Sequence, residues 1–247
     1  MNNYKMTVEY DGTRYNGWQK QHTTHNTVQG KFEHILAELL EEPAEIHASG
    51  RTDAGVHAKG QVFNFKTKKN IEPEEILAYC NRYLPQDVRV LCCERADERF
   101  HSRLSAVRKT YSYTIALQKP SVFKRKYVYY AEDIRPDADK MRKAAELLLG
   151  THDFLAFSSL KKSKKSTVRT IESIEIIEQA EEIRMEFTGN GFLYHMVRIL
   201  AGTLLDAGLG KIDAATILKA FETGERQDAG TMLPPEGLTL ERVEYDK

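Results

Sequence analysis

The apolar residues of this chain produce the same order of predicted elements twice, and that repeat constrains the fold more than any other feature. Residues 4–10 alternate apolar and polar side chains, as a half-buried strand does. A helix is predicted to start near Asn26 or Thr27, because either side chain can cap it and apolar residues then recur along one face. The first half continues as strand, strand, helix and strand over residues 45–48, 60–67, 73–84 and 88–93.

The second half follows the same order with additional strands. Its predicted elements are strands at 110–117 and 127–130, a helix at 137–149, a hairpin of 168–177 with 183–187, helices at 193–207 and 213–221, and a strand at 238–245. Gly150 is expected to end the first of these helices with a left-handed cap. The sequence therefore predicts an α+β fold of two tandem ferredoxin-like (split βαβ) halves with antiparallel sheets, divided into residues 1–104 and 105–247.

Composition places the chain among ordinary globular proteins of a reducing compartment. Its 247 residues are 41% apolar and 29% charged, enough for one large domain or two modest ones. The three cysteines form no CxxC pair, since Cys92 and Cys93 are adjacent and Cys80 is alone. The N-terminal residues lack the apolar region of a secretion signal. We therefore expect a cytoplasmic protein.

The formal net charge is zero, yet the charges are segregated along the chain. Residues 99–131 contain eight Lys or Arg and no acid, and residues 154–171 contain five more basic residues without an acid. The Lys-rich run from Lys161 to Lys165 would by itself be read as a solvated loop. Two acid-free stretches, one with interleaved aromatic residues, favour a surface that faces RNA. We expect the two sheets to form a central RNA-binding cleft.

Several kinds of catalytic chemistry have no signature in this sequence. The chain contains no P-loop, no GxGxxG after a strand, no HExxH, no zinc-deaminase motif and no GxSxG. If the chain is an enzyme, it is expected to act with side chains alone, without cofactor or metal.

A polar stretch from Gly50 to Ala58 holds the best candidate for such a side chain, Asp53. Gly50 and Gly55 are expected to reach positive φ and to bend the chain around it. One interpretation is a polar turn in which Asp53 caps its own backbone. The other is a nucleophile, which must be ionised, desolvated and aimed, and which a nearby cation such as Arg51 would keep ionised.

Arg198 lies within an apolar helical stretch, where an arginine either extends its charge to solvent or pairs with a buried acid. Tyr111 follows Arg108 and Lys109, and an exposed aromatic beside basic residues suits stacking on an extruded base and contact with phosphates. Tyr113 lies on the same strand face and is better explained as core. Trp18, the only tryptophan, is either core or a platform for a base.

A series of longer motifs resembles the tRNA pseudouridine synthase A family over nearly the whole chain. The motifs occur in the family's order and lie at residues 10–13, 17–19, 50–58, 99–113, 150–154, 191–198, 202–205 and 234–238. Tyr15, Ser102 and Leu233 stand where the family usually has Phe, Ala and Ala. These departures leave open whether the chain is the main enzyme or a paralogue with a narrower range of substrates.

The resemblance implies a cofactor-free isomerase that converts uridine to pseudouridine at positions 38, 39 and 40 in the anticodon arm of tRNA, as a homodimer. It further implies that Asp53 is the nucleophile and that Arg198 pairs with it. Tyr111 would contact the target uridine and handle its C5 proton. Arg51 would hold the loop or the space that the flipped base leaves. Attack by Asp53 at C6 of uracil and attack at C1′ of ribose both remain open.

The alternative from another functional class is a non-catalytic RNA-binding protein built of paired ferredoxin-like modules. Such modules would carry the RNP1 pattern of basic, Gly and aromatic residues, and the sequence has none. This alternative also gives no reason for the polar stretch around Asp53.

Overall fold

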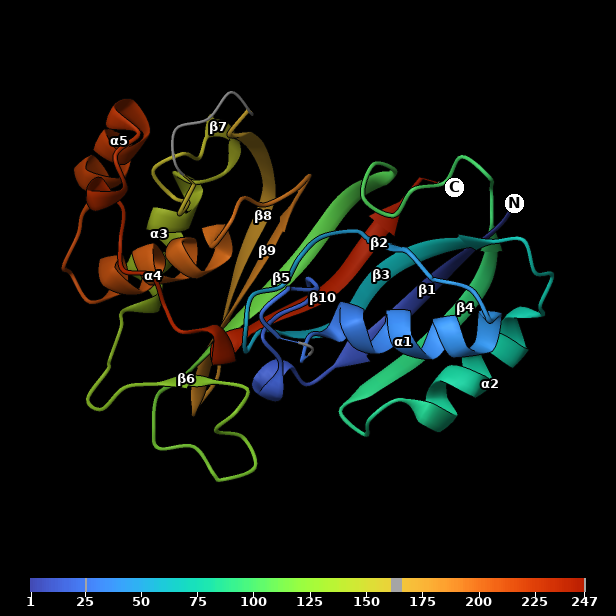
Figure 1. Cartoon of the computed structure of the whole chain (residues 1–247). Helices are drawn as coiled ribbons and strands as arrows, with labels where there is room; N and C mark the ends of the chain where they lie inside the picture. The colour runs from blue at the N-terminus through green and yellow to red at the C-terminus, as the bar shows by residue number, and fades with distance from the viewer. Residues whose placement is uncertain (25, 161–165, 247) are drawn as a thin grey trace. The chain divides into compact units, whose positions relative to one another are not determined.

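A computed structural model describes residues 1–24, 26–160 and 166–246 of the chain. It separates into two compact units, and each is described by itself. Unit 1 contains residues 1–107 together with the C-terminal residues from Thr239, and unit 2 contains residues 108–238. Both units combine helices with largely antiparallel strands (Figure 1), which confirms the predicted α+β class.

Unit 1 has the predicted strand-helix-strand-strand-helix-strand order. Its elements are β1 (Asn2–Tyr10), the 3-10 helix η1 (Gly12–Arg14), α1 (Val28–Leu40), β2 (Ile46–Ala48), β3 (His57–Thr67), α2 (Pro73–Tyr83) and β4 (Val88–Ala96). The strands are ordered β4-β1-β3, and β2 pairs with β3. All these pairs are antiparallel, with Met6 opposite Phe63 on one side and Cys93 on the other. This is the strand order of a ferredoxin-like sheet.

Local sequence explains where the helices of unit 1 begin. Of the two predicted capping residues, Asn26 and Thr27, it is Thr27 that caps α1, by accepting a hydrogen bond from the backbone N–H of Gly30. Pro73 occupies the first turn of α2, where the missing N–H has no cost. The two helices lie beside each other (Figure 1). The fully buried Phe32, Leu36 and Ile76 contribute their side chains to the core.

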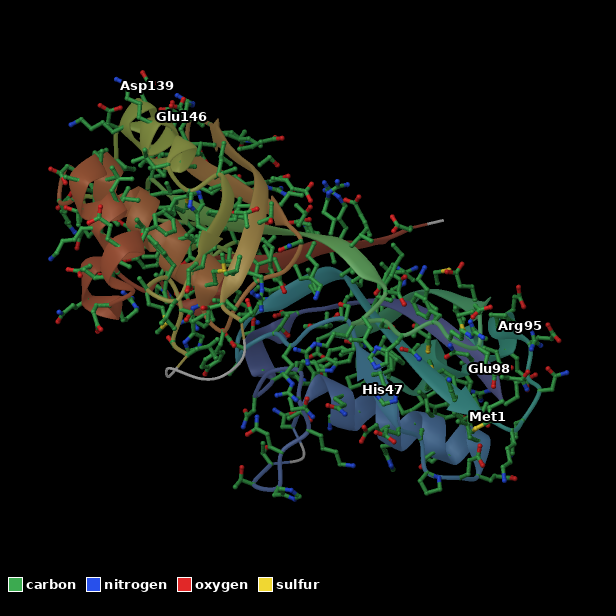
Figure 2. The ribbon with its side chains drawn as sticks, turned by 90° about the horizontal axis from the view of Figure 1, so that it is seen from above. Met1, His47, Arg95, Glu98, Asp139 and Glu146 are labelled. Atoms are coloured by element: carbon green, nitrogen blue, oxygen red, sulfur yellow. The ribbon has the colours of Figure 1, made fainter. Side chains whose placement is uncertain are left out.

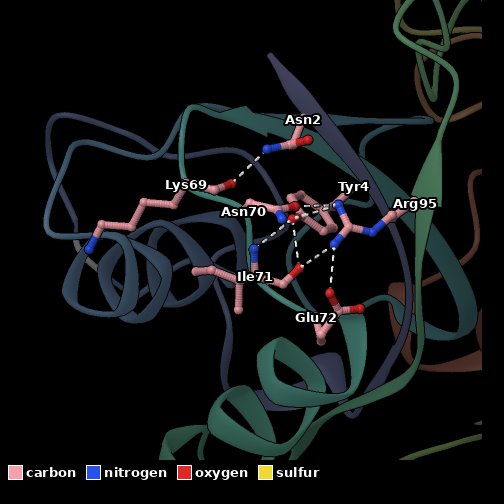
Figure 3. A network of polar contacts seen from close by, with 7 residues as sticks. All are labelled: Asn2, Tyr4, Lys69, Asn70, Ile71, Glu72 and Arg95. Carbon is pink, nitrogen blue, oxygen red and sulfur yellow. Dashed lines mark hydrogen bonds and ion pairs between the residues drawn. The ribbon is translucent and has the colours of Figure 1, made fainter.

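An arginine fixes the loop before α2, whose N-cap residue Glu72 makes no side-chain capping bond. The Arg95 guanidinium donates to the Ile71 carbonyl at 3.2 Å and to Glu72 Oε1 at 3.1 Å (Figure 3). The hydroxyl of buried Tyr4 donates to the same carbonyl at 2.7 Å and accepts from the Ile71 N–H at 3.1 Å. Charge-assisted bonds therefore hold the start of α2 against β1 and β4. Arg95 lies at the same end of unit 1 as Met1 and Glu98 (Figure 2). The terminal amine of Met1 is 3.6 Å from Oε1 of the Glu98 carboxylate.

Unit 2 is built on four antiparallel strands in the order β5-β9-β8-β7. Its strands are β5 (Ala106–Ala116), β6 (Tyr129–Tyr130), β7 (Gly150–Asp153), β8 (Val168–Glu178) and β9 (Glu182–Gly189). Its helices are α3 (Ala138–Glu146), α4 (Met196–Gly208) and α5 (Ala214–Thr223), with 3-10 turns η2 (Arg226–Asp228) and η3 (Pro235–Gly237). The hairpin of β8 and β9 is confirmed. Every residue of α4 is buried, whereas Asp139 and Glu146 of α3 project outward (Figure 2).

Two predictions for the second half differ from the structure. The helix predicted over 137–149 ends at Glu146, and Gly150, with φ of 94°, begins strand β7 instead of capping the helix directly. A strand of four residues is too short to show alternation in the sequence. The final strand β10 (Leu238–Tyr245) has the predicted bounds. It pairs in parallel with β3, with Thr239 opposite His57, so that residues from Thr239 belong to unit 1 and not to the predicted 105–247 domain.

No helix among the described residues combines the length and the apolar character needed to cross a membrane.

Candidate active site

The loop that carries Asp53 connects β2 to β3 in unit 1 and is tied to the sheet at its start. Ser49 donates its backbone N–H to the Val62 carbonyl at 2.7 Å and its hydroxyl to Gln61 Oε1 at 2.7 Å. The Gln61 amide donates back to the carbonyl of Gly50 at 3.1 Å. These buried bonds fix where the loop leaves the sheet.

A turn follows at Asp53 itself. The backbone N–H of Val56 donates to the Asp53 carbonyl at 3.1 Å, and Gly55 adopts the expected positive φ of 80°. The same expectation was wrong for Gly50, which is not among the positive-φ residues. The loop needs left-handed backbone only at its tip, since the bond from Gln61 already directs the chain at Gly50.

Residues 12–18 pack closely against the other side of the loop. The backbone N–H of Trp18 donates to the Thr52 carbonyl at 3.0 Å, and the backbone N–H of Gly55 donates to the Tyr15 carbonyl at 3.3 Å. A Cβ built on Gly12 would lie 1.9 Å from the carbonyl oxygen of Val56. Backbone therefore touches backbone here, and the loop is held between residues 12–18 and β3.

The buried side chains of Thr52 and His57, for which the sequence predicted no role, complete the support of the loop. The ring Nδ1 of His57, 3% exposed, accepts the backbone N–H of Gly12 at 3.0 Å. The hydroxyls of Tyr10 and Thr52 are 2.7 Å apart, and both residues are buried. Thr52 and His57 lie inside the polar motif, but their partners are 42 and 45 residues away, so no local pattern could have revealed these bonds.

Tyr10 makes the support of the loop sensitive to alkaline pH. Burial raises the pKa of Tyr10 to about 12. The unfolded chain loses this proton near pH 10 and the folded chain keeps it, so stability falls as pH rises above about 10. We expect a slope of about 1.4 kcal/mol per pH unit from Tyr10 between these values. Urea unfolding at several pH values checks this. Tyr10→Phe should show a shallower alkaline decline than wild type, and equal slopes would contradict the role assigned to Tyr10.

Within this frame Asp53 is half-buried, Arg51 is exposed and Thr52 between them is buried. The loop thus presents the Asp53 side chain at a fixed place while leaving it partly accessible. Trp18, in contrast, is a core residue: its side chain is 1% exposed and packs among Tyr10, Phe32 and Phe63, with ring centroids 5.9 to 6.4 Å away. The suggested platform for a base is therefore not supported for Trp18.

In unit 2, Tyr111 lies on β5 opposite Phe187. The expectation of an exposed ring was wrong, because the residue is only 8% exposed and the ring of Phe192 packs edge-on against it at 5.2 Å. Tyr113 is fully buried as expected and donates its hydroxyl to the Pro234 carbonyl at 2.8 Å.

Arg198 lies in the first turn of α4 and is 9% exposed, so its charge does not extend to solvent. Its Nε donates to the Leu233 carbonyl at 2.7 Å, and its own carbonyl accepts the Leu233 N–H at 3.2 Å. Two bonds to one residue hold both the backbone and the guanidinium of Arg198, which makes it a positioned cation.

The basic residues before Tyr111 are half-exposed. Arg108 Nε donates to Glu172 Oε2 at 2.6 Å, with side chains 41% and 37% exposed, so this pair contributes little to stability. Lys109 is also half-exposed. The basic run from Lys161 to Lys165 lies outside the described residues. The predicted site residues thus divide between Asp53, Arg51 and Trp18 in unit 1 and Tyr111, Arg108, Lys109 and Arg198 in unit 2.

A family model described as "tRNA pseudouridine synthase" matches residues 6–103 and 144–246 of the chain. The chain belongs to this family. It is thus an enzyme that isomerises uridine to pseudouridine in tRNA, as the resemblance of its motifs implied.

Relatives over the full length carry the same activity in their names. The tRNA pseudouridine synthase A of Bacillus subtilis (strain 168) is 45% identical, covering 98% of both chains. The tRNA pseudouridine synthase A of Bacillus sp. (strain KSM-64) is 44% identical, and tRNA pseudouridine synthase A 2 of Clostridium perfringens (strain 13 / Type A) is 43% identical. Both alignments cover 99% of this chain and all of the relative.

The reaction of a tRNA pseudouridine synthase requires reacting groups that are held in place. The enzyme must break the N1–C1′ bond of a uridine, turn the base and rejoin it through C5. A nucleophile for this step has to be fixed before the base arrives, because misplacement by about 1 Å costs on the order of 10²-fold in rate. The bonds from Tyr10, Tyr15, Trp18 and His57 hold the loop that carries Asp53.

Proposed function

We propose that this tRNA pseudouridine synthase modifies uridines 38, 39 and 40 in the anticodon arm and that Asp53 is its nucleophile. The observation that carries the assignment is the position of Asp53: it is the half-buried carboxylate at the tip of a loop held by backbone bonds on both sides. A mere polar turn would need no such support.

In the proposed reaction the target base leaves the stack, at a cost of a few kcal/mol. The Asp53 carboxylate adds to C6 of uracil or to C1′ of ribose, and the N1–C1′ bond breaks. After the base turns, C5 bonds to C1′ and the bond between the carboxylate and C6 or C1′ breaks, which returns Asp53 to its ionised form. C5 then loses its proton while N1 gains one, so the product is an isomer of the substrate and no cofactor is consumed.

Two residues of unit 2 and one of unit 1 complete the proposal. Arg198 pairs with Asp53, which fits a cation that is buried and held by Leu233. Tyr111 contacts the uridine and handles its C5 proton. Arg51, exposed beside Asp53, holds the loop or the space that the flipped base vacates.

The proposed contacts to the tRNA backbone come from Arg108 and Lys109. Both side chains are half-exposed, and the exposed ion pair of Arg108 with Glu172 can be exchanged for a phosphate at small cost. We further propose that the enzyme is a cytoplasmic homodimer, as its family resemblance implies. The central RNA-binding cleft stays a prediction.

Release of tritium from tRNA labelled at C5 of its uridines tests the function directly, because only the proposed reaction replaces that hydrogen. We expect release that stops when uridines 38, 39 and 40 are all replaced by cytidine. Release that persists from this substituted tRNA would overturn the assigned positions.

Tyr111 can be tested by two substitutions that separate its ring from its hydroxyl. If the hydroxyl handles the C5 proton, Tyr111→Phe should lower the single-turnover rate by about 10²-fold or more and leave tRNA affinity unchanged. Tyr111→Ala should also weaken binding, because the ring that packs on Phe192 is lost. A normal rate for Tyr111→Phe with an inactive Tyr111→Ala would show that the ring alone is needed. Tyr113→Phe is a matched control on the same strand face for the cost of losing a buried hydroxyl.

A further inference from the structure

The segment that leads into α4 contains a residue with unusual backbone. His195 adopts the left-handed conformation, with φ of 63° and ψ of 1°, at the N-cap position, and its side chain makes no capping bond. It is one of three non-glycine residues with positive φ in the described ranges, together with Glu41 and Asp133. Such a conformation persists only where the surroundings enforce it, and it often occurs at functional sites.

The consequence of this turn is that two neighbouring side chains stack. In extended chain, successive side chains point to opposite sides. Here the rings of Tyr194 and His195 lie with centroids 3.6 Å apart at an interplanar angle of 29°. His195 Nδ1 is 2.8 Å from the hydroxyl of Ser159, and the Ser159 N–H donates to the Tyr194 carbonyl at 3.1 Å. Ser159 therefore holds both members of the pair.

Despite this support, Tyr194 remains 51% exposed. An aromatic ring that is fixed on one side and open on the other loses little conformational entropy when a planar ligand stacks on it. The pair is thus already arranged to receive such a ligand.

The pair also lies in a segment that carries one proposed site residue of unit 2, Arg198, and contacts another, Tyr111. Phe192, two residues before Tyr194, packs on Tyr111, and Arg198 follows four residues after it. A Cβ on Gly191 would be 3.7 Å from the side chain of Arg169, so a cation lies beside the same segment. Residues 187–205 contain no acid. An open aromatic ring with a nearby cation and no acid in its own segment is the combination that binds unstacked bases of single-stranded RNA.

We propose that Tyr194 stacks on an unpaired nucleobase of the bound tRNA and that the left-handed turn at His195 positions its ring. The inference rests on the proposed function, since it assigns a further contact to the same substrate. His195 acts through Tyr194 and is a positioning residue.

Binding of an unmodified tRNA transcript to the full-length enzyme tests this contact independently of turnover. Tyr194→Ala should raise the Kd about 5- to 160-fold, the range for loss of one stacked base, and should raise KM more than it lowers kcat. Tyr194→Phe should restore the affinity. Tyr83→Ala is the matched control, because Tyr83 is also 51% exposed and also contacts another ring, that of Tyr79 at 4.6 Å. It should bind tRNA as the wild type does.

The positioning role is tested at His195. His195→Asn retains a residue that tolerates left-handed backbone and can bond to Ser159, and should keep more affinity than His195→Val, whose branched side chain disfavours that backbone. Equal affinities for these two variants would overturn the positioning role.

Unchanged tRNA affinity in Tyr194→Ala would overturn the stacking contact. If that variant also changed its oligomeric state, the Tyr194 ring would be assigned to contact with a second copy of the chain instead. These outcomes are separate from failure of the proposed function, which would appear as absent tritium release from tRNA by the wild-type enzyme.

Discussion

Replacing Asp53 with Asn should abolish pseudouridine formation while tRNA affinity stays near that of the wild-type enzyme. Asparagine keeps the size of the side chain and most of its hydrogen bonding, and the loop is held by backbone bonds that the substitution does not touch. What is lost is the anionic carboxylate that we propose as the nucleophile, and a neutral amide oxygen does not replace it. We expect the single-turnover rate to fall by at least about 10⁴-fold. The measurement pairs tritium release with binding of the same tRNA.

Two comparisons make this result specific. Asp53→Ala, which cannot revert to Asp by deamidation, should be equally inactive, so that traces of product in the Asn variant can be recognised. Asp139→Asn, on the outer surface of α3 with a side chain 81% exposed, should turn over normally. Steady product formation by clean Asp53→Ala protein would rule out Asp53 as the nucleophile.

A single methyl group on Gly12 should damage the same loop without changing any polar group. The added Cβ would lie 1.9 Å from the carbonyl oxygen and 2.5 Å from the carbonyl carbon of Val56, and neither backbone atom can rotate away. Either η1 or the Asp53 loop must shift by more than about 1 Å. We expect Gly12→Ala to lower the free energy of unfolding by about 1–3 kcal/mol and the turnover rate by about 10²-fold.

Urea unfolding and single-turnover kinetics measure the two effects. The matched control is Gly191→Ala, whose Cβ would meet the Arg169 side chain at an ordinary 3.7 Å, and which should unfold as the wild type does. A folded Gly12→Ala enzyme with normal stability and turnover would show that contact with residues 12–18 does not fix the loop.

The motifs predicted the reaction of this protein better than they predicted which motif side chains are buried. The family match confirms the reaction, while the roles of Asp53, which is half-buried, and Arg198, which is buried, stay predictions. The exposure of Tyr111 was misjudged and the place of Trp18 was left open, because an aromatic residue in a short polar motif has the same local signal whether it faces solvent or core. Burial depends on which distant elements cover the ring, such as Phe192 over Tyr111.

The sequence by itself determined the order of the elements in the first half, a capped start of α1 near Asn26 or Thr27, the bounds of β10 and the family, because periodicity, caps and motifs are local properties. Only the tertiary structure decided that β10 pairs with β3 and returns the chain end to unit 1. It also decided that bonds from Tyr10 and His57 hold the Asp53 loop and that the rings of Tyr194 and His195 stack. Local patterns in a sequence show that the apolar face of a helix or strand must be covered. They do not show which residues far along the chain cover that face or hold a loop in place.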